Sequence, residues 1–232
     1  METLSANVHR LLLRGDRAQI VFAPGQYLEI HVGESWLPFS IASAPTGDGT
    51  LELHVQYAPQ SASARSLFEL LAVGRELEVR LPGGEALLDL DDPRPLLLIA
   101  AGTGFAQMKA IVEASLAHRP DRPVHLWWAA RERQELYLES MARDWQAQFP
   151  RFSFTPVVEC HEEGFDGVVE RIDRALHQRL ENAHEASIFI SGSPGMVYAV
   201  VDTLERIAPA AERLFSDVFS YAPRDAGERP AP

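Results

Sequence analysis

The stretch Leu96-Leu-Leu-Ile-Ala-Ala-Gly-Thr-Gly-Phe105 decides the fold of this chain. Its first six residues are apolar without alternation, which is typical of a strand buried on both faces of a parallel sheet. A glycine turn follows at Gly102-Thr103-Gly104, and it presents free backbone N–H groups and a helix N-terminus to an anion such as a pyrophosphate. Because Gln107 stands where a third glycine would complete the dinucleotide pattern, this segment alone leaves a purely structural strand–turn–helix open.

A second glycine segment strengthens the dinucleotide interpretation. Ser191-Gly-Ser-Pro-Gly-Met-Val197 follows the apolar run Ile188–Ile190 and precedes another helical pattern. Two glycine-bearing strand ends in one parallel sheet can face the same crevice, where the ligands of open sheets bind. Together the two segments predict a dinucleotide site at that edge of the sheet.

The pattern differs on the two sides of residue 92. After it, apolar strands alternate with helices, which indicates a parallel sheet covered on both faces. We expect the strands at 96–100, 124–129, 152–158, 187–191 and 214–219, and the helices at 106–118, 134–148, 168–180 and 195–207. Before it, short alternating runs between turn residues indicate the antiparallel strands of a small barrel. Those runs are 27–32, 51–57 and 76–81, with one helix at 64–72.

The predicted fold class is therefore a two-domain β-barrel plus α/β protein. An N-terminal antiparallel barrel domain covers 1–92, and a Rossmann-like parallel-sheet domain covers 93–221, with the charged, proline-bearing DDPRP at 91–95 as the linker. The tail at 222–232 consists of proline, glycine, alanine and charged residues, so we expect it to be disordered.

Composition excludes several classes of function. The 232 residues carry 21 Lys plus Arg and 33 Asp plus Glu, a net charge of −12 that disfavours binding to nucleic acid or to an anionic membrane surface. One cysteine, Cys160, excludes an internal disulfide, a multi-cysteine zinc site and an iron–sulfur cluster held by this sequence. We expect no metal site. No leader or membrane-length apolar run is visible, so we expect a cytoplasmic protein.

Six short motifs in order carry a resemblance to a known family. They are Gly25-Gln-Tyr27, Pro38-Phe-Ser40, Gly102-Thr-Gly-Phe105, Trp127-Trp-Ala-Ala-Arg131, Gly192-Ser-Pro-Gly-Met196 and Leu214-Phe-Ser-Asp-Val-Phe219. Over residues 20–221 the chain resembles the ferredoxin–NADP reductase superfamily, and most closely the bacterial NAD(P)H–flavin reductases within it. The resemblance implies a barrel that binds the flavin (FAD, FMN or riboflavin) and a second domain that lays the nicotinamide of NADH or NADPH against it.

The resemblance also implies roles for individual residues. Ser40 matches the position whose hydroxyl approaches flavin N5, and Asp217 matches an acid near the nicotinamide, so these two are the candidate catalytic residues. The candidate cofactor-binding residues are Pro38, Phe39, Ser40, Ile41, His54, Val55, Ser66, Gly102, Thr103, Gly104, Phe105, Arg131, Gly192, Ser193, Pro194, Met196 and Phe219. Structural alternatives stay open: a strand serine at 40, a turn or cap residue at 217 and a core aromatic at 219. We also expect a valine at Gly104 to weaken nicotinamide binding while leaving the fold intact.

The sequence departs from the family pattern where the flavin phosphate would bind. Leu37 replaces the arginine before Pro-Phe-Ser, and residues 61–66 lack the glycine that lets a backbone approach phosphate, with only Ser66 and Arg65 near enough in sequence to help. We therefore expect a flavin reductase whose flavin is an exchangeable ligand. The alternatives are an FAD-containing module that passes electrons to an iron–sulfur or oxygenase partner, and a nucleotide-sensing subunit that inherited the fold.

Overall fold

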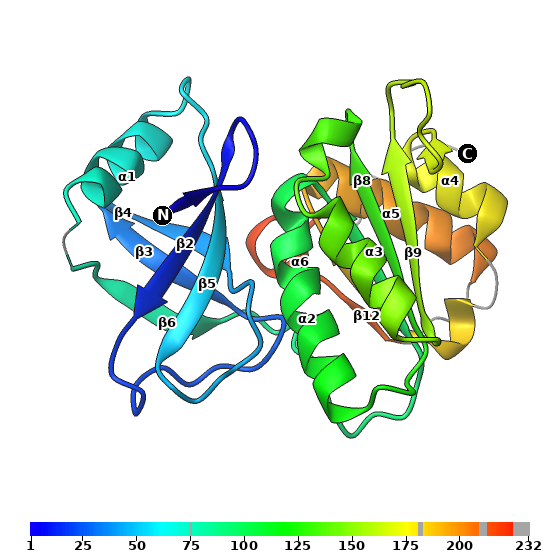
Figure 1. The fold of residues 1–232 in the computed structure, drawn as a ribbon, viewed down its shortest axis with the longest axis horizontal. Helices are drawn as coiled ribbons and strands as arrows, with labels where there is room; N and C mark the ends of the chain where they lie inside the picture. The colour runs from blue at the N-terminus through cyan, green and yellow to red at the C-terminus, as the bar shows by residue number, and fades with distance from the viewer. Residues whose placement is uncertain (75, 181–182, 209–212, 225–232) are drawn as a thin grey trace.

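The computed structural model describes residues 1–74, 76–180, 183–208 and 213–224. Figure 1 shows two bodies side by side: antiparallel strands form the N-terminal one, and a sheet flanked by helices forms the other. This arrangement confirms the predicted fold class.

The N-terminal body consists of two three-stranded antiparallel sheets. One has the order β1 (Glu2–Thr3), β2 (Val8–Arg14), β5 (Thr50–Gln56), and the other has the order β4 (Ser35–Ser40), β3 (Tyr27–Val32), β6 (Val79–Gly83). Alternation places the core: Leu28, Ile30 and Val32 of β3 are buried, whereas the residues between them are half-buried. The helix α1 (Ala62–Ala72) is capped by Ser61 and buries Leu67 in this core.

The second body is a six-stranded parallel sheet. Its order is β10 (Val168–Val169), β9 (Phe152–Val158), β8 (Val124–Ala130), β7 (Leu96–Ala101), β11 (Ser187–Ser191), β12 (Leu214–Phe215). Leu98 and Ala100 of β7 pack with α2 (Phe105–His118) and α3 (Glu139–Gln148) on one face. Leu97 and Ile99 pack with α4 (Ile172–Arg179) and α5 (Pro194–Ile207) on the other. Burial on both faces explains why this strand reads as a continuous apolar run.

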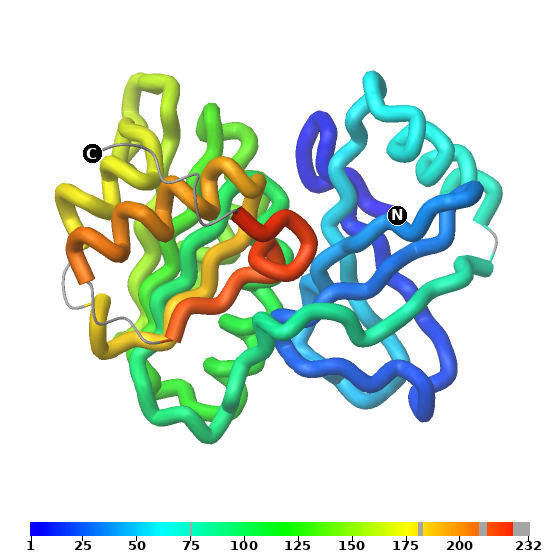
Figure 2. Tube along the Cα trace, turned by 180° about the vertical axis from the view of Figure 1, so that it is seen from behind, coloured from blue at the N-terminus to red at the C-terminus, as the bar shows by residue number. Residues whose placement is uncertain are grey.

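The order in which successive strands are added reverses at β7, although all six strands run in the same direction. The helix α2 leads from β7 to β8 on one side, and β11 lies on its other side, so the carboxyl ends of β7 and β11 are adjacent. This is the switch point at which open parallel sheets bind ligands. Figure 2 shows the C-terminal segment, which contains the short helix α6 (Val218–Tyr221), between the two bodies.

Four predicted elements differ in the structure. The strand expected at 76–81 is β6, which begins only at Val79 and extends to Gly83. The helix expected at 134–148 begins only at Glu139, after the short 3-10 turn η2 (Arg133–Glu135), because Leu136 is buried in the core and interrupts the helical path. The helix expected at 168–180 begins at Ile172, because Val168 and Val169 extend the sheet as β10 and pair with Val157 and Val158. β-Branched residues favour that extended pairing.

The last predicted strand, 214–219, is also wrong beyond its first two residues. Only Leu214 and Phe215 pair with β11, and Asp217 then adopts helical angles at the start of α6. Of the tail, residues 222–224 are held against α5: the Tyr198 hydroxyl donates to the Ala222 carbonyl, and Arg224 pairs with Asp202 at 2.6 Å. The predicted disorder of 225–232 lies outside the described residues.

Candidate active site

A cleft of about 620 Å³ lies where the barrel meets the carboxyl edge of the parallel sheet. Its walls come from β3, β4 and β5 on the barrel side, from the ends of β7 and β11, and from the segment around Asp217. Of the predicted site residues, these line the cleft: Pro38, Phe39, Ser40, His54, Gly102, Thr103, Gly104, Gly192, Ser193 and Asp217. Sequence positions up to about 180 residues apart are thereby brought to one cavity.

The other predicted residues lie away from this lining. Ile41 and Val55 are buried in the barrel core, and Phe105 is buried in a stack on Trp128 with ring centroids 3.8 Å apart. Pro194 and Met196 form the first turn of α5, and Phe219 packs beside Tyr198. Ser66 is exposed on α1, and Arg131 is exposed after β8. Their binding roles stay predictions.

Sequence reasoning missed several residues that line the cleft. They are Tyr27, Glu29, Gln56, Ala101, Ala106, Ser191, Ser216 and Val218. Tyr221, which the resemblance makes an aromatic candidate for contact with the stacked rings, also lines the cleft. Strand alternation offered a signal for three of them, because Tyr27 and Glu29 share one face of β3, and Gln56 shares a face of β5 with His54. The residues after β12 carried no such periodic signal.

The glycine turn after β7 is a single 3-10 turn, η1 (Gly102–Gly104), that leads directly into α2. Gly102 has a φ of +54° and lines the cleft, and a Cβ added there would meet no other atom. Gly104 has ordinary helical angles, but a Cβ there would collide with the backbone carbonyl of Ser191. The expectation that a valine at this position leaves the fold intact is therefore wrong, because this glycine lets β7 and β11 approach.

The second helix N-terminus at this edge belongs to α5. Ser193 caps it, because its hydroxyl accepts from the backbone N–H of Met196 at 3.4 Å, and Pro194 occupies the first turn. Pro194 has no N–H and the Met196 N–H is bonded to Ser193, so this turn keeps one free backbone donor, the N–H of Gly195. That donor and the positive end of the helix favour an anionic group.

Ser40 ends β4, and its hydroxyl makes no hydrogen bond within the described part of the chain. Its backbone neighbour across the sheet is Tyr27, and both side chains line the cleft. A half-buried hydroxyl with no internal partner is free to bond a ligand atom in the cavity.

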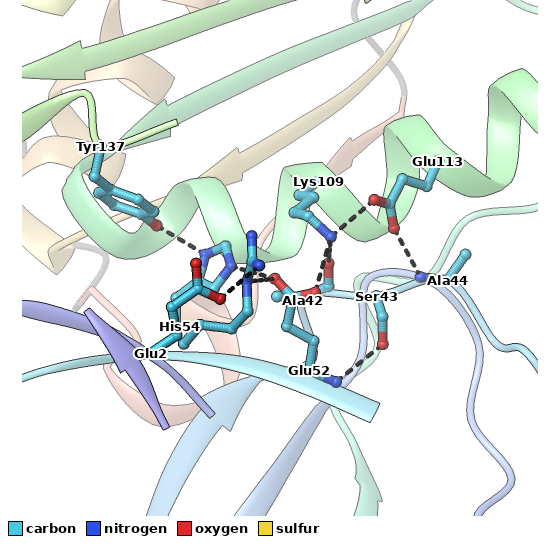
Figure 3. A network of polar contacts seen from close by, with 10 residues as sticks. Glu2, Ala42, Ser43, Ala44, Glu52, His54, Lys109, Glu113 and Tyr137 are labelled. Atoms are coloured by element: carbon cyan, nitrogen blue, oxygen red, sulfur yellow. Dashed lines mark hydrogen bonds and ion pairs between the residues drawn. The ribbon is translucent and has the colours of Figure 1, made fainter. Parts of the chain in front are cut away.

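Behind the cleft, a network of polar groups joins the two bodies (Figure 3). The ammonium of Lys109 on α2 donates to the Ala42 carbonyl oxygen at 3.0 Å and pairs with Glu52 at 3.3 Å and Glu113 at 2.8 Å. Glu113 also accepts from the backbone N–H of Ala44 at 3.3 Å. The network therefore binds α2 to two consecutive segments of the barrel.

His54 lies at the cleft end of this network. Its Nε2 lies 2.7 Å from a Glu52 oxygen, and its Nδ1 lies 3.0 Å from the Tyr137 hydroxyl. Since a carboxylate only accepts, Nε2 carries the proton and Nδ1 accepts from Tyr137. Burial lowers the pKa of His54, although the Glu52 contact opposes that shift. The pKa of Glu52 is lowered despite its burial, because His54, Lys109 and Arg10 favour the carboxylate.

Asp217 is the acidic residue that the C-terminal segment contributes to the cleft. Its Oδ2 accepts from the Gln107 side-chain amide at 2.9 Å. Burial raises the pKa of Asp217, while the backbone N–H groups of Ala86 and Glu85 and the amide of Gln107 act in the opposite direction. Protonation of this carboxyl is therefore sensitive to its hydrogen-bond donors.

The described residues hold neither a metal-binding cluster nor a membrane-spanning helix. They contain no cluster of three or more His, Cys, Asp or Glu side chains that would hold a metal ion. Within the same ranges, no helix has both the length and the apolar character needed to cross a bilayer.

The chain matches known proteins over both bodies. Residues 1–87 match the oxidoreductase FAD-binding domain, and residues 98–202 match the oxidoreductase NAD-binding domain. The chain is 32% identical over 228 residues to the NAD(P)H-flavin reductase of Vibrio harveyi, which covers 95% of this chain and 96% of that protein. It is 33% identical to reductase component 1 of terephthalate 1,2-dioxygenase from Comamonas sp, covering 95% of this chain and 67% of the relative.

A solved structure agrees with these matches. An Amycolatopsis cytochrome P450 reductase superposes with a TM-score of 0.81 at 28% identity, over 92% of this chain and 65% of that one. Fold, cleft and matched domains define a two-domain oxidoreductase that uses a flavin and a nicotinamide nucleotide. The chain belongs to the NAD(P)H–flavin reductase family of the ferredoxin–NADP reductase superfamily.

The residues of the cleft fit these two ligands. Pro38 and Phe39 offer an apolar surface to a flat ring, and Ser40 adds a free hydroxyl beside it. Across the cavity, η1 offers backbone N–H groups to a pyrophosphate, and the start of α5 adds the positive end of its helix. The volume of about 620 Å³ lies in the usual range for small-molecule sites.

Proposed function

We propose that this protein reduces flavin as a dissociable substrate, taking a hydride from NADH or NADPH and releasing the reduced flavin. The observation that carries the proposal is the composition of the cleft: no lysine or arginine lines it among the described residues, whereas Glu29 and Asp217 do. A flavin phosphate would find no cation there. Binding must therefore depend on the ring, and loss of charge-assisted phosphate contacts makes a ligand exchangeable.

The positions of Leu37 and Ser66 support the same proposal. Leu37 packs against the barrel core where the family has an arginine, and Ser66 is exposed on α1 away from the residues that line the cleft. Neither segment supplies a charged contact to a phosphate in the cleft.

The chain's own residues have distinct tasks in this scheme. A bound flavin supplies the ring that accepts the hydride. Ser40 would donate its hydroxyl to the ring where negative charge develops, and the cavity walls would hold the two rings in contact. The nucleotide phosphates would bind at Gly102, at Gly104 and at the first turn of α5. Asp217 would hold or release a proton beside the nicotinamide end.

The test is the oxidation of NADH and NADPH, followed by absorbance, with riboflavin, FMN and FAD added in turn. We expect turnover to require added flavin and to be similar for the three flavins. Turnover without added flavin, or with FAD alone, would contradict the proposal.

A second candidate is an electron-transfer module that retains FAD and reduces a partner protein. The observation in its favour is the match to a terephthalate dioxygenase reductase component, of which the chain spans about two thirds. Such a module would be yellow after purification and would reduce a one-electron acceptor. A redox partner protein and a cytoplasmic location are likewise proposals; reduction of a purified partner and cell fractionation test them.

A further inference from the structure

Gln107 is a polar side chain that is only 2% exposed, near the start of α2. It occupies the position at which a dinucleotide pattern would have its third glycine. Its amide nitrogen donates to two acceptors from distant parts of the chain: the carbonyl oxygen of Gly25 and, at 2.9 Å, Oδ2 of Asp217. One side chain thus joins the barrel, α2 and the C-terminal segment.

Asp217 lies close to the barrel as well as to α2. A Cβ on Gly84 would lie only 2.6 Å from Oδ1 of Asp217, so the carboxylate sits directly against the backbone that follows β6. That backbone is held in turn by Gln26, whose amide donates to the Gly84 carbonyl at 3.2 Å. The titratable groups that face Asp217 are Tyr27 of β3 and Tyr221 of α6. Burial is the main cause that raises the pKa of both; the charge of Glu29 and then that of Asp217 add to it at Tyr27, and the charge of Asp217 adds to it at Tyr221.

We propose that Gln107 is a positioning residue for hydride transfer, which holds the Asp217 carboxylate in the cleft and fixes it to the barrel through Gly25. The inference rests on the proposed function, because it concerns the same cleft. The nicotinamide side and the flavin side of the cavity belong to different bodies. A donor shared between them therefore sets where the acidic group stands relative to both rings.

The test is a double-mutant cycle on single-turnover NADH oxidation with added FMN. Gln107→Met has nearly the same length but no donor, and Asp217→Ala removes the acceptor. We expect Gln107→Met to slow hydride transfer about tenfold in the parent, as for loss of a hydrogen bond to a charged group, and less than about twofold in the Asp217→Ala background. Equal slowing in the two backgrounds would overturn the proposal.

Lys109→Met is the matched control, because it removes another contact between α2 and the barrel without touching Asp217. Its effect on the rate, of whatever size, should be the same with and without Asp217. If Lys109 is coupled to Asp217 as strongly as Gln107 is, general loosening of the interface explains the result. That outcome would overturn the specific role of Gln107.

The pH profile gives a readout that a purely structural role would not move. Because a donor to a carboxylate lowers its pKa, removal of the Gln107 amide raises the pKa of Asp217. One limb of the pH–rate profile should be absent in Asp217→Ala, which assigns it to this carboxyl. In Gln107→Met this limb should move to higher pH by about one unit, and in Lys109→Met it should stay in place. An unmoved limb, or the absence of any limb that depends on Asp217, would refute the assignment.

A flavin-free measurement separates this inference from the proposed function. The same cycle is run on urea unfolding without flavin or nucleotide, where Gln107→Met should shift the midpoint more in the parent than in Asp217→Ala. Additive midpoints would overturn the contact even if flavin reduction is confirmed. If Gln107→Met does not fold, Gln107→Glu replaces it, because it keeps the shape of the side chain and places a second carboxylate opposite Asp217. The Asp217-dependent limb of the pH–rate profile must then move to higher pH by more than is expected for Gln107→Met.

Discussion

The ammonium nitrogen of Lys109 lies 3.0 Å from the carbonyl oxygen of Ala42, and this contact joins α2 to the barrel. Lys109 is the single lysine of the sequence, and it is 3% exposed. Its charge is balanced by Glu52 and Glu113, one from each body. The chain thus places its one lysine at the joint between its two halves.

Replacing this lysine should weaken that joint. Lys109→Met leaves the carboxylates of Glu52 and Glu113 without their shared cation, and breaking a buried pair costs about 3 kcal/mol in the free energy of unfolding. Urea unfolding measures the change. Arg171→Met, which breaks an exposed pair with Asp173, is the control and should change the value by less than about 1 kcal/mol. Similar small effects for the two variants would contradict the prediction.

Ser40→Ala should slow the chemical step rather than weaken the fold. A donor to developing charge contributes about 2–4 kcal/mol at the transition state, or two to three decades in rate. Single-turnover flavin reduction is the measurement. Ser35→Ala, at the exposed start of the same strand, is the matched control and should react like the parent. A Ser40→Ala rate within a factor of two of the parent would leave Ser40 a structural residue.

The two glycines of η1 should respond differently to alanine. The added methyl group of Gly102→Ala meets no protein atom, so we expect only about 1 kcal/mol of strain, from the positive φ. Because the methyl group would stand between the backbone and a bound phosphate, we expect a raised KM for the nicotinamide nucleotide. Gly104→Ala collides with the Ser191 backbone, so we expect it chiefly to lower the melting temperature. Gly47 also has a positive φ, +72°, at an exposed position, so Gly47→Ala is the control and should leave KM unchanged. An unaltered KM in folded Gly102→Ala would refute the nucleotide assignment.

Purified protein should be largely colourless. The cleft offers the ring an apolar wall but offers a phosphate no basic side chain among the described residues, so riboflavin should bind about as well as FMN or FAD. Titration of each flavin, followed by gel filtration, measures both affinity and retention. The prediction would be falsified if stoichiometric FAD survived the column; that result would favour the electron-transfer module instead.

Acid should destabilise the protein through His125. Burial lowers the pKa of this imidazole from 6.5 to about 4, while its Nε2 lies 2.9 Å from the Thr155 hydroxyl. Because the unfolded chain binds the proton more readily, stability is fully present above pH 6.5 and is lost as the pH falls toward 4, by about 3 kcal/mol. The measurement is urea unfolding across this range. His125→Gln should flatten the dependence, whereas replacement of the exposed His118 by Gln should not.

The four central strands of the parallel sheet, β9, β8, β7 and β11, could be predicted because their apolar runs show their burial in the sequence. The prediction failed where a single buried side chain overrides a local pattern. Leu136 delays α3, and Val168 pairs with β9 instead of beginning a helix. Tertiary packing decides such positions, and helix propensity does not report it.

The cleft could be predicted in part for a similar reason. Ser40, Gly102 and Gly104 lie in contiguous motifs, whereas the bond between Gln107 and Asp217 joins residues 110 positions apart. Gln107 looked like a defect in a glycine pattern, and nothing in its neighbourhood pointed to an acceptor. The order of the motifs likewise did not indicate that the Leu37 side chain faces the barrel core. It also did not indicate which faces of β3 and β5 meet the nucleotide domain.

Lys109 also gives the chain a built-in reporter. An acylating reagent has one lysine side chain to modify in this sequence, and that side chain is out of reach while α2 stays docked on Ala42. The rate at which the Lys109 peptide gains mass therefore measures how often the two halves part. Comparing that rate in the presence of flavin, of nicotinamide nucleotide and of both shows which ligand keeps the halves together, without a dye or a substituted residue.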